Sequence, residues 1–524
     1  MSLPTEQFLI FTILACVAAT IYYRQRKGLR LPPGPPGIPI VGNLFDFPEE
    51  NDPFPWKEHL ELYGPISSVS TFGKTVVIVN DRQTAIDLMN QRSIVYSGRP
   101  IFTFAGELIS WDQQMILSQN NPHFQSMRKL LKSFIGTKSA IVAFEHLQET
   151  ETRLFLLRML RKSGELIPNI RLTAGAIALR ISHGYTIDTD ITKDDPLVDL
   201  IQTAAKEFYI ATRPGAWMVD IFPWLKYVPD WATFVPFKRA GAIFRAHNLE
   251  QANRPLDFVK REMEQGNAYP SFTSAMLSEV SSNPQDNSEH HIKWAANSIY
   301  GGGTDPSVAA LSTFFMLMIL HPDIQDKARA ELDKVVGTRR LPTFQDRPNL
   351  PYIEALIKEL LRWHPVGRIG IPHRCVEEDV FNGYRIPKDA IILPHMWNYT
   401  RDPSTYSRPS EFRPERFLGE EPELDPNSFI FGFGRRACPG QDFANAHMFI
   451  TIVLVLSVFH IKKGKDTNGN EINVKPEFNI GTVCHPKHFP YTLECRSAEA
   501  EELIRSISDS EEFKQREGGN RIAV

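Results

Sequence analysis

The sequence predicts a mainly helical protein with small β-sheets, preceded by one N-terminal transmembrane helix. Three observations support this fold class. Apolar residues recur at helical spacing along much of the chain, strand-like runs are short and few, and residues 8–23 form an unbroken uncharged stretch. With 524 residues, of which 42% are hydrophobic, the chain can bury a large core.

The apolar run 8–23 is short for a membrane helix, which needs about 20 residues, but its flanks favour one. Basic residues follow the run between Arg24 and Arg30. The positive-inside rule keeps that side of a membrane in the cytosol. A cleaved signal peptide is the alternative, and it would need basic residues before the run and small residues after it. We therefore expect residues 1–23 to be a single-pass membrane anchor with the remaining chain in the cytosol.

A basic and proline-rich hinge is predicted for residues 24–44. Residues 31–39 read LPPGPPGIP, a stiff run with few backbone donors that cannot continue a helix. A proline-rich ligand for a partner protein is the alternative. Residues 45–496 contain no internal repeat and no low-complexity linker, which predicts one large domain. The polar residues 497–524 predict a frayed helix or a disordered tail.

Inside the large domain, four segments have clear patterns. The run TVVIV at residues 75–79 and the apolar residues 390–393 before Pro394 predict strands. Residues 353–361 have apolar positions at i, i+3, i+4, i+7 and i+8, which predicts an amphipathic helix. Residues 441–459 are apolar on nearly every face, which predicts a buried helix.

Charge and cysteine usage exclude several classes of protein. A formal charge of -3 offers no basic excess, so a nucleic-acid partner is not expected. The cysteines are scattered and form no C-x-x-C pair, which argues against a zinc site and a disulfide framework. They are Cys16, Cys375, Cys438, Cys484 and Cys495.

Cys438 stands in the run FGFGRRACPG, residues 431–440, directly before the helix expected from Gln441. Glycines permit a tight loop and a close approach to a flat partner. Free amides and the helix dipole at a helix N-terminus favour a thiolate, which is the form that binds a metal. Haem iron with one axial thiolate is the fitting partner. The alternative for a lone cysteine is a buried structural residue.

The spacing F-x-x-G-x-R-x-C-x-G resembles the haem-binding loop of the cytochrome P450 superfamily. This resemblance implies the cytochrome P450 fold and a haem b with Cys438 as axial ligand, bound in a haem-thiolate catalytic domain. It also implies that Phe431, Gly434, Arg436 and Gly440 bind the cofactor around the thiolate.

A second motif has the form E-x-x-R at Glu359 and Arg362. Three residues apart on a helix, these side chains can pair. Because they lie away from the apolar stripe by periodicity, an exposed ion pair of about 0 to 1 kcal/mol is the alternative. The run RPERF at residues 413–417 follows, and then the cysteine loop. This order resembles that of the same family, which implies a structural triad of Glu359, Arg362 and Arg416.

Residues 292–320 are a helix candidate that contains a glycine triplet, residues 301–303, and Pro306. Each glycine costs a helix ~1 kcal/mol and a proline ~3 kcal/mol. An ordinary kink, or two helices joined by a break, is one interpretation. A distorted helix passing over a flat cofactor is the other.

The same segment resembles the family's oxygen-binding helix, with Gly302, Gly303, Thr304, Asp305 and Ser307 at the pattern's positions. The resemblance implies that Gly302 and Gly303 lie at the haem and that Asp305, with Ser307 or Thr304, organises the catalytic water. Pro306 stands where the family usually has threonine, and proline can neither donate nor accept through its side chain.

A second departure lies at Phe124, where the family commonly has tryptophan four residues before Arg128. The resemblance implies that Arg128, His373 and Arg436 bind the haem propionates. A solvated helix-face charge is the alternative for Arg128, because Lys129 and Lys132 lie beside it. A basic face there would suit an acidic, flavin-bearing reductase.

The resemblance extends over nearly the whole chain and is greatest to microsomal fungal members related to O-methylsterigmatocystin oxidoreductase. It implies a monooxygenase that oxidises a small hydrophobic secondary metabolite with dioxygen. Electrons would come from NADPH through NADPH-cytochrome P450 reductase, with cytochrome b5 as a second candidate donor. The endoplasmic reticulum membrane is the expected location.

Two other functions remain open from the sequence. Because of Pro306, the enzyme could catalyse radical coupling, isomerisation or dehydration without inserting oxygen. From a different class, the protein could be a membrane-anchored haem binder without turnover.

Overall fold

The computed structural model describes residues 29–48, 56–162, 164–187, 195–213, 215–229, 236–282, 288–479 and 481–510. The chain forms two compact units, each assembled from segments distant in sequence. Of the described residues, unit 1 comprises those from Leu29 to Pro100, Ile369–Tyr399 and Gly432–Ala437, and unit 2 comprises those in Ile101–Arg368, Thr400–Phe431 and from Cys438 to Ser510. The single domain predicted over residues 45–496 thus includes segments of both compact units. Because the chain passes between the units several times, no linker marks their boundary.

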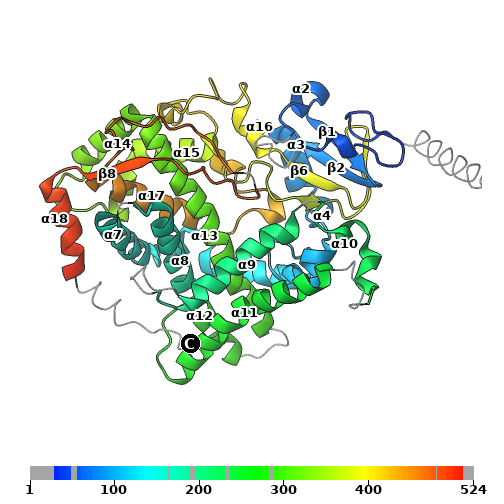
Figure 1. The fold of residues 1–524 in the computed structure, drawn as a ribbon, viewed down its shortest axis with the longest axis horizontal. Coiled ribbons are helices and arrows are strands. Elements are labelled where there is room, and N and C mark those ends of the chain that lie inside the picture. The colour runs from blue at the N-terminus through cyan, green and yellow to red at the C-terminus, as the bar shows by residue number, and fades with distance from the viewer. Residues whose placement is uncertain are drawn as a thin grey trace, which may run out of the picture. The chain divides into compact units, whose positions relative to one another are not determined.

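Unit 1 is built on a four-stranded sheet whose strands follow the order β1-β2-β6-β3. Figure 1 labels β1, β2 and β6 of this sheet. The strand β2 pairs antiparallel with β1 and parallel with β6, and β3 pairs antiparallel with β6. The strands are β1 (Ile66–Thr71), β2 (Lys74–Val79), β3 (His373–Arg374) and β6 (Ile391–Pro394). Phe72 and Gly73 join β1 to β2 with φ of 47° and 77°, the positive values that a tight hairpin turn requires. The strands predicted at 75–79 and 390–393 are thus present, the second one residue later.

The remaining elements of unit 1 are short. They include the helices α2 (His59–Tyr63), α3 (Arg82–Ile86) and α4 (Ser93–Tyr96), and the hairpin of β4 (Asp379–Phe381) and β5 (Tyr384–Ile386). The helix α16 (Met396–Arg401) crosses from unit 1 into unit 2.

The described part of the proline-rich segment lies on β1. Ser68 donates its N–H to Pro33 O and its hydroxyl to Pro32 O, both at 2.7 Å. A Cβ at Gly34 would lie 1.8 Å from Ser68 O, so only glycine allows this approach. The described part of the segment is not helical, and Pro32 and Pro33 contact β1 through these bonds. The anchor and residues 24–28 lie outside the described residues.

Unit 2 is mainly helical. Its described helices of nine or more residues and its strands are α5 (Pro122–Ile135), α7 (Glu145–Arg161), α8 (Leu166–His183), α9 (Pro196–Thr212), α11 (Pro236–Glu264), α12 (Phe272–Ser282), α13 (Ser288–Leu320), α14 (Pro322–Val335), α15 (Pro351–Trp363), α17 (Gln441–Val458), α18 (Ala498–Ser506), β7 (Phe459–Lys463) and β8 (Tyr491–Cys495). The strands β7 and β8 form an antiparallel pair. The helices predicted at 353–361 and 441–459 are α15 and α17.

Two of the described helices, α13 and α17, are long and apolar enough to cross a membrane, and both are mostly buried within the protein. They belong to the main core of unit 2. In Figure 1 the helix α13 runs beside α8, which packs on it more extensively than the other described elements do. A second, aromatic core joins α9 and α11 to residues 102–117, with Phe104, Trp111, Phe208 and Phe237 buried in it.

The predicted polar tail begins as an ordered helix. Ser497 caps α18, and Ala500, Ile504 and Ile507 are buried in the main core. Ala500 and Ile504 are four residues apart and share one apolar face of the helix. The overall composition of the segment is charged, so it does not indicate this face. Residues 511–524 lie outside the described residues.

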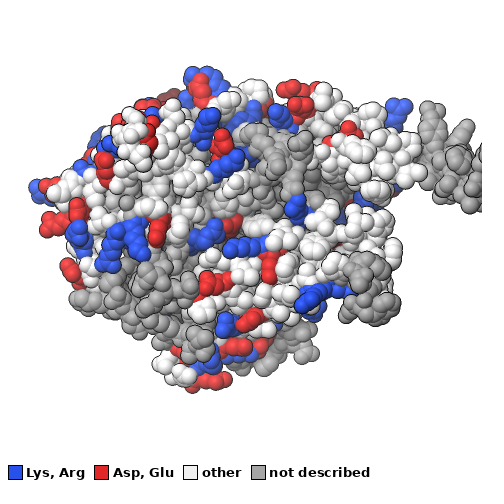
Figure 2. Space-filling view, in the orientation of Figure 1, with Lys and Arg blue, Asp and Glu red and all other residues white. Residues whose placement is uncertain are grey.

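Lys and Arg residues are interspersed with Asp and Glu residues on the face that Figure 2 shows. This mixture agrees with the net charge of -3.

Candidate active site

The loop around Cys438 is closed by a backbone hydrogen bond and leads directly into α17. Cys438 donates its N–H to Phe431 O at 2.7 Å, and Gly440 is the residue before α17 begins. The N–H of Gly440 donates to the Cys438 sulfur. The side chain of Cys438 is exposed, so a ligand can reach the sulfur.

The electrostatic surroundings of Cys438 act in opposite directions. Solvent can reach the side chain, yet protein atoms surround it closely enough that desolvation raises the pKa of the thiol. The Gly440 N–H and the positive charge of Arg128 lower it in part. The helix N-terminus alone therefore does not produce the thiolate that the sequence suggested. Binding of a metal ion to the sulfur would do so.

Two other described cysteines, Cys375 and Cys484, differ from Cys438 in their exposure. Cys375 and Cys484 are buried, and their thiols donate to Glu377 O and Gly481 O. Burial raises the pKa of both thiols. Backbone hydrogen bonds lower the pKa of both thiols in part, as Gly440 does for Cys438, so the exposure of its side chain is what distinguishes Cys438. Cys438 therefore fits an iron ligand better than these two cysteines do.

Unit 1 gathers three basic side chains that the propionates of a haem would fit. His373 is buried, and its Nδ1 hydrogen-bonds Tyr96 O at 2.7 Å. Arg436 donates its Nε–H to Ser97 O at 2.8 Å. Arg99 donates to Pro372 O at 2.7 Å, and burial lowers its pKa to about 9. Burial, followed by the charges of Arg99 and Arg436, lowers the pKa of His373 to about 3. Buried cationic side chains stabilise a bound anion that contacts them.

In unit 2, Arg128 projects from α5 and is half-buried, so the alternative of a fully solvated charge does not apply. Its neighbours Lys129 and Lys132 are exposed. Phe124, at the position of the family's tryptophan, is buried and offers no donor. Desolvation lowers the pKa of Arg128, and Cys438 raises it. The structure thus places Arg128 within electrostatic reach of the sulfur.

Two further motif residues shape the loop. Gly434 has φ of 50°, and a Cβ there would lie 2.2 Å from Met89 O. Only glycine fits such a position. Phe431 is half-buried against the main core of unit 2.

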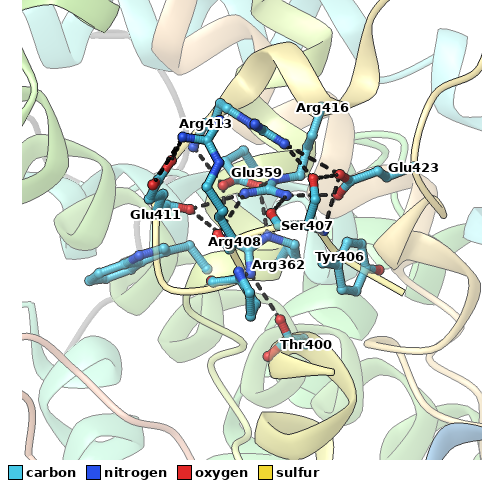
Figure 3. Close-up of polar contacts among 12 residues, drawn as sticks. Glu359, Arg362, Thr400, Tyr406, Ser407, Arg408, Glu411, Arg413, Arg416 and Glu423 are labelled. Atoms are coloured by element: carbon cyan, nitrogen blue, oxygen red, sulfur yellow. Dashed lines mark hydrogen bonds and ion pairs between the residues drawn. The ribbon is translucent and has the colours of Figure 1, made fainter. Parts of the chain in front are cut away.

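The three residues of the predicted structural triad meet in unit 2 (Figure 3). Arg362 donates to both carboxylate oxygens of Glu359, at 2.7 and 2.8 Å. Arg416 Nε lies 3.1 Å from Glu359 Oε2. All three side chains are 0% exposed, so the exposed ion pair expected from periodicity is wrong. The apolar stripe of α15 is wide enough, and covered on enough sides, to bury the face that carries them.

Arg362 also orders the segment between α16 and the cysteine loop. Its guanidinium donates to three backbone carbonyls, those of Thr400, Pro409 and Glu411, at 2.8 to 3.0 Å (Figure 3). Arg416 continues the network to Glu423 at 2.7 Å. A charged centre with this many partners holds a segment that has little regular structure of its own.

The glycine triplet lies within α13, which is one continuous helix. Gly301 and Gly302 are exposed, and a Cβ on either would meet no atom within 4 Å. Gly303 is half-buried, with Ala178 of α8 at 4.0 Å from such a Cβ. An open, side-chain-free face in an otherwise buried helix fits a flat group such as haem.

The polar residues after the triplet are already hydrogen-bonded. Thr304 donates its hydroxyl to Tyr300 O at 3.0 Å, and Ser307 donates to Gly303 O at 2.6 Å. The carboxylate of Asp305 binds Arg171, Tyr209 and His485. The structure therefore does not bring Thr304, Asp305 and Ser307 into contact with one another through these bonds.

Sequence reasoning missed four polar residues of this region: Arg99, Arg171, Tyr209 and His485. Arg99 follows Tyr96, Ser97 and Gly98 in a run without a recognised pattern. The other three are scattered along the chain, and only the fold brings them to Asp305. No spacing signal could have identified them.

Comparison with known proteins agrees with these features. The family model for cytochrome P450 matches residues 32–493. The chain is 53% identical to cytochrome P450 monooxygenase claR of Ampulloclitocybe clavipes, over 97% of this chain and 95% of that protein. It is 42% identical to cytochrome P450 monooxygenase 208 of Postia placenta, over 95% and 97% of the two chains. It is 37% identical to O-methylsterigmatocystin oxidoreductase of Aspergillus flavus, over 92% and 91%. Together with the accessible Cys438 sulfur and the open glycine face of α13, these matches show that the chain belongs to the cytochrome P450 family.

Proposed function

We propose that this protein is a haem-thiolate monooxygenase that oxidises a small hydrophobic secondary metabolite. The observation that carries the proposal is the Cys438 side chain, which is exposed at the start of α17, unlike the buried thiols of Cys375 and Cys484. The names of the relatives, cytochrome P450 monooxygenases, support an oxidoreductase.

In this proposal Cys438 would ligate the haem iron, and Arg99, Arg128, His373 and Arg436 would bind the haem propionates. Haem bound in this way activates dioxygen, and its thiolate ligand pushes electron density that favours O–O cleavage. Gly302 and Gly303 leave room for the cofactor and dioxygen beside α13. The aromatic core of Phe104, Trp111 and Phe208 supports an apolar substrate.

Asp305 is the carboxylate that we propose to hold a proton-donating water near the open glycine face. Its neighbour Pro306 contributes no hydroxyl. To bind that water as donors, the hydroxyls of Thr304 and Ser307 would have to break their hydrogen bonds to the carbonyls of Tyr300 and Gly303. Electrons would come from NADPH through a flavoprotein reductase. The exposed Lys129 and Lys132 support docking of an acidic partner such as that reductase or cytochrome b5.

We further propose attachment to the endoplasmic reticulum membrane through residues 8–23. Exposed apolar side chains between α10 (Met218–Ile221) and residue 227 support a second contact with the membrane. Trp224 and Tyr227 are 62% and 78% exposed, and aromatic residues of this kind favour the membrane–water interface.

Replacing Cys438 by Ser tests the proposal. We expect the wild-type protein, reduced and treated with carbon monoxide, to show the Soret band of thiolate-ligated haem. We expect Cys438→Ser to lose this band, because a hydroxyl does not supply the thiolate. The matched control is Cys484→Ser, which removes a buried thiol and should retain the band. A Cys438→Ser protein with the wild-type spectrum would refute the assignment.

Pro306 favours a second candidate, an oxidation without oxygen insertion. Proline removes the hydroxyl that most family members have at this position. Turnover under labelled dioxygen distinguishes the two functions, because a monooxygenase transfers one labelled atom to the product and the alternative transfers none. A non-catalytic haem binder would consume no NADPH in response to substrate and reductase.

A further inference from the structure

The side-chain amide nitrogen of Asn297, on α13, is a buried hydrogen-bond donor without a partner among the described residues. Asn297 is 4% exposed, so bulk water does not take the place of a partner. Leaving a donor buried and unpaired costs a folded protein free energy, and buried donors in native proteins usually have a partner. The amide is therefore placed for a molecule that is not part of the chain.

Another buried asparagine of unit 2, Asn248 of α11, shows the bonds that such an amide usually makes. Its Nδ2 donates to Ile109 O at 3.1 Å. Its Oδ1 accepts from Gln114 Nε2 at 3.0 Å and from Gln251 Nε2 at 2.9 Å. These bonds stabilise the fold and give Asn248 a structural role. The Nδ2 of Asn297 makes no bond of this kind within the described residues, so the packing of the chain does not account for it.

Contacts of neighbouring residues show which elements this side of α13 faces. Lys293, one turn before Asn297, donates from Nζ to Asn253 Oδ1 of α11 at 2.9 Å. His290, about two turns before Asn297, has its Nε2 at 3.2 Å from Gln113 Oε1. Residues four and seven positions apart share one face of a helix. Asn297 therefore lies on the face of α13 that is directed toward α11 and Gln113.

These neighbours of Asn297 belong to the elements that form the aromatic core of unit 2. Gln113 lies two residues after Trp111, whose ring centroid is 4.6 Å from that of Phe208, and α11 contributes to the same core. In the other direction along α13, Gly301 lies one turn after Asn297 on the same face. It is exposed, and a Cβ on it would meet no atom within 4 Å. Along α13, Asn297 therefore lies between the part that we propose to accept the substrate and the part that we propose to hold the cofactor.

The chemistry of the Asn297 amide limits what its partner can be. An amide N–H donates a hydrogen bond and cannot accept one, so the partner must be an acceptor atom. The amide is also uncharged, so it does not offset the desolvation of a carboxylate in an apolar site. A neutral oxygen, such as that of a ketone, a quinone or an ether, meets both conditions.

We propose that Asn297 determines the substrate specificity of the enzyme by donating a hydrogen bond to a neutral acceptor oxygen of the substrate. The substrate is then an apolar metabolite that carries a carbonyl or ether oxygen, and hydrocarbons without such an oxygen bind more weakly. The hydrogen bond fixes one point of the substrate relative to the open glycine face, while apolar contacts hold the remainder. Asn297 acts on binding and takes no part in the oxidation itself. This inference rests on the proposed function and names its substrate class.

The test compares fluorenone with fluorene, which share a flat three-ring shape and differ in one carbonyl oxygen. Dissociation constants for the haem-loaded protein are measured by isothermal titration calorimetry, which does not depend on turnover. We expect wild type to bind fluorenone about tenfold more tightly than fluorene, a preference that one buried hydrogen bond can supply. Asn297→Leu keeps a similar side-chain shape but has no donor, so it should bind the two compounds about equally. The matched control is Asn253→Leu, which changes an exposed asparagine of α11 and should keep the preference.

Thermal unfolding of the haem-loaded protein without substrate gives a second measurement, which does not depend on the two compounds. Asn297→Leu should raise the midpoint of unfolding, because it removes an unpaired buried donor. Asn248→Leu should lower the midpoint, because it leaves Ile109 O and the amides of Gln114 and Gln251 without these bonds. The opposite signs distinguish a donor directed to a ligand from a donor that belongs to the fold.

The inference is overturned if wild type does not bind fluorenone more tightly than fluorene, or if Asn297→Leu keeps that preference. It is also overturned if Asn297→Leu lowers the midpoint of unfolding as strongly as Asn248→Leu does, since the amide would then already be bonded to an internal water. If Asn297→Leu does not fold, the affinities of Asn297→Ala decide the question, because alanine removes the donor without adding bulk and should lose the preference. Failure of the proposed function is distinguishable, because wild type would then lack the Soret band of thiolate-ligated haem, whatever the two affinities are.

Discussion

At the scale of single residues, Pro306 changes the hydrogen bonding of α13 at the open glycine face. A helical residue at this position would donate its N–H to the carbonyl four residues earlier, that of Gly302, and proline has no such N–H. Ser307 and Thr304 use their hydroxyls on the carbonyls of Gly303 and Tyr300. In this segment the Gly302 carbonyl therefore lacks its usual helical N–H donor. The hydroxyls of Thr304 and Ser307 already donate to other backbone carbonyls.

Pro306→Thr should increase both stability and coupling. The restored N–H and the relief of the proline ring should stabilise the protein by up to about 3 kcal/mol, which thermal unfolding measures. The added hydroxyl should raise the yield of product per NADPH, because it is a further group that can hold the proton-donating water. The control is Pro255→Thr, which changes the proline inside α11 and should leave the yield unchanged. An unchanged yield in Pro306→Thr would contradict the role assigned to this position.

How far residues could be predicted depends on whether their function leaves a local pattern. The loop around Cys438 has fixed spacing because its glycines must avoid particular backbone atoms, as Gly434 avoids Met89 O. Spacing therefore predicted this loop. Arg99 and His485 reach their partners through contacts between segments far apart in sequence, Ile371 and Pro372 for Arg99 and Asp305 for His485. No local sequence pattern predicts such contacts.

At the scale of elements, the short helix α15 organises residues 400–423 through Glu359 and Arg362. Periodicity predicted α15 correctly but placed this pair on an exposed face. A helix that is covered on several sides buries residues outside its apolar stripe, and burial is then possible only for charges that are paired. The resemblance to a known family, rather than the periodicity, supplied the interpretation that agrees with the structure.

Glu359→Gln should destabilise the protein by about 3–5 kcal/mol, because it leaves the guanidinium groups of Arg362 and Arg416 buried without their shared counter-charge. The matched control is Arg408→Gln, which breaks the exposed pair with Glu411 and should cost about 0–1 kcal/mol. Thermal unfolding compares the two variants. Equal, small effects would show that the buried triad contributes little, and the network of Figure 3 would then have to be held by its backbone hydrogen bonds.

At the scale of the whole molecule, both compact units consist of segments that are not contiguous in sequence. Composition and linker signals detect boundaries only where the chain crosses once between domains. Elements were accordingly easier to predict than the units they form. The long helices α13 and α17 were evident from apolar content, whereas the small sheet of unit 1 joins β1 and β2 to strands about 300 residues later.

Four of the buried histidines among the described residues have strongly lowered pKa values: His183, His364, His373 and His447. Burial is the largest cause in each case and lowers the pKa to about 3 for the first three and to about 4 for His447. A histidine in the unfolded chain titrates near its ordinary value of 6.5. Below that pH the unfolded state binds more protons than the folded state, so stability falls as the pH falls, by up to about 1.4 kcal/mol per pH unit for each histidine.

This argument gives the last prediction, which concerns proton uptake on unfolding. At pH 5 each of these histidines should bind about one proton when the protein unfolds, because it is protonated in the unfolded chain and neutral in the folded one. His447→Leu should therefore reduce the measured uptake by about one proton. His447 is suited to the test because neither of its ring nitrogens has a hydrogen-bond partner within the described residues. Thr451→Val, one turn further along α17 and equally buried, should leave the uptake unchanged. The uptake is measured by pH-stat titration during unfolding in denaturant. An unchanged uptake in His447→Leu would mean that this ring is already protonated inside the folded protein.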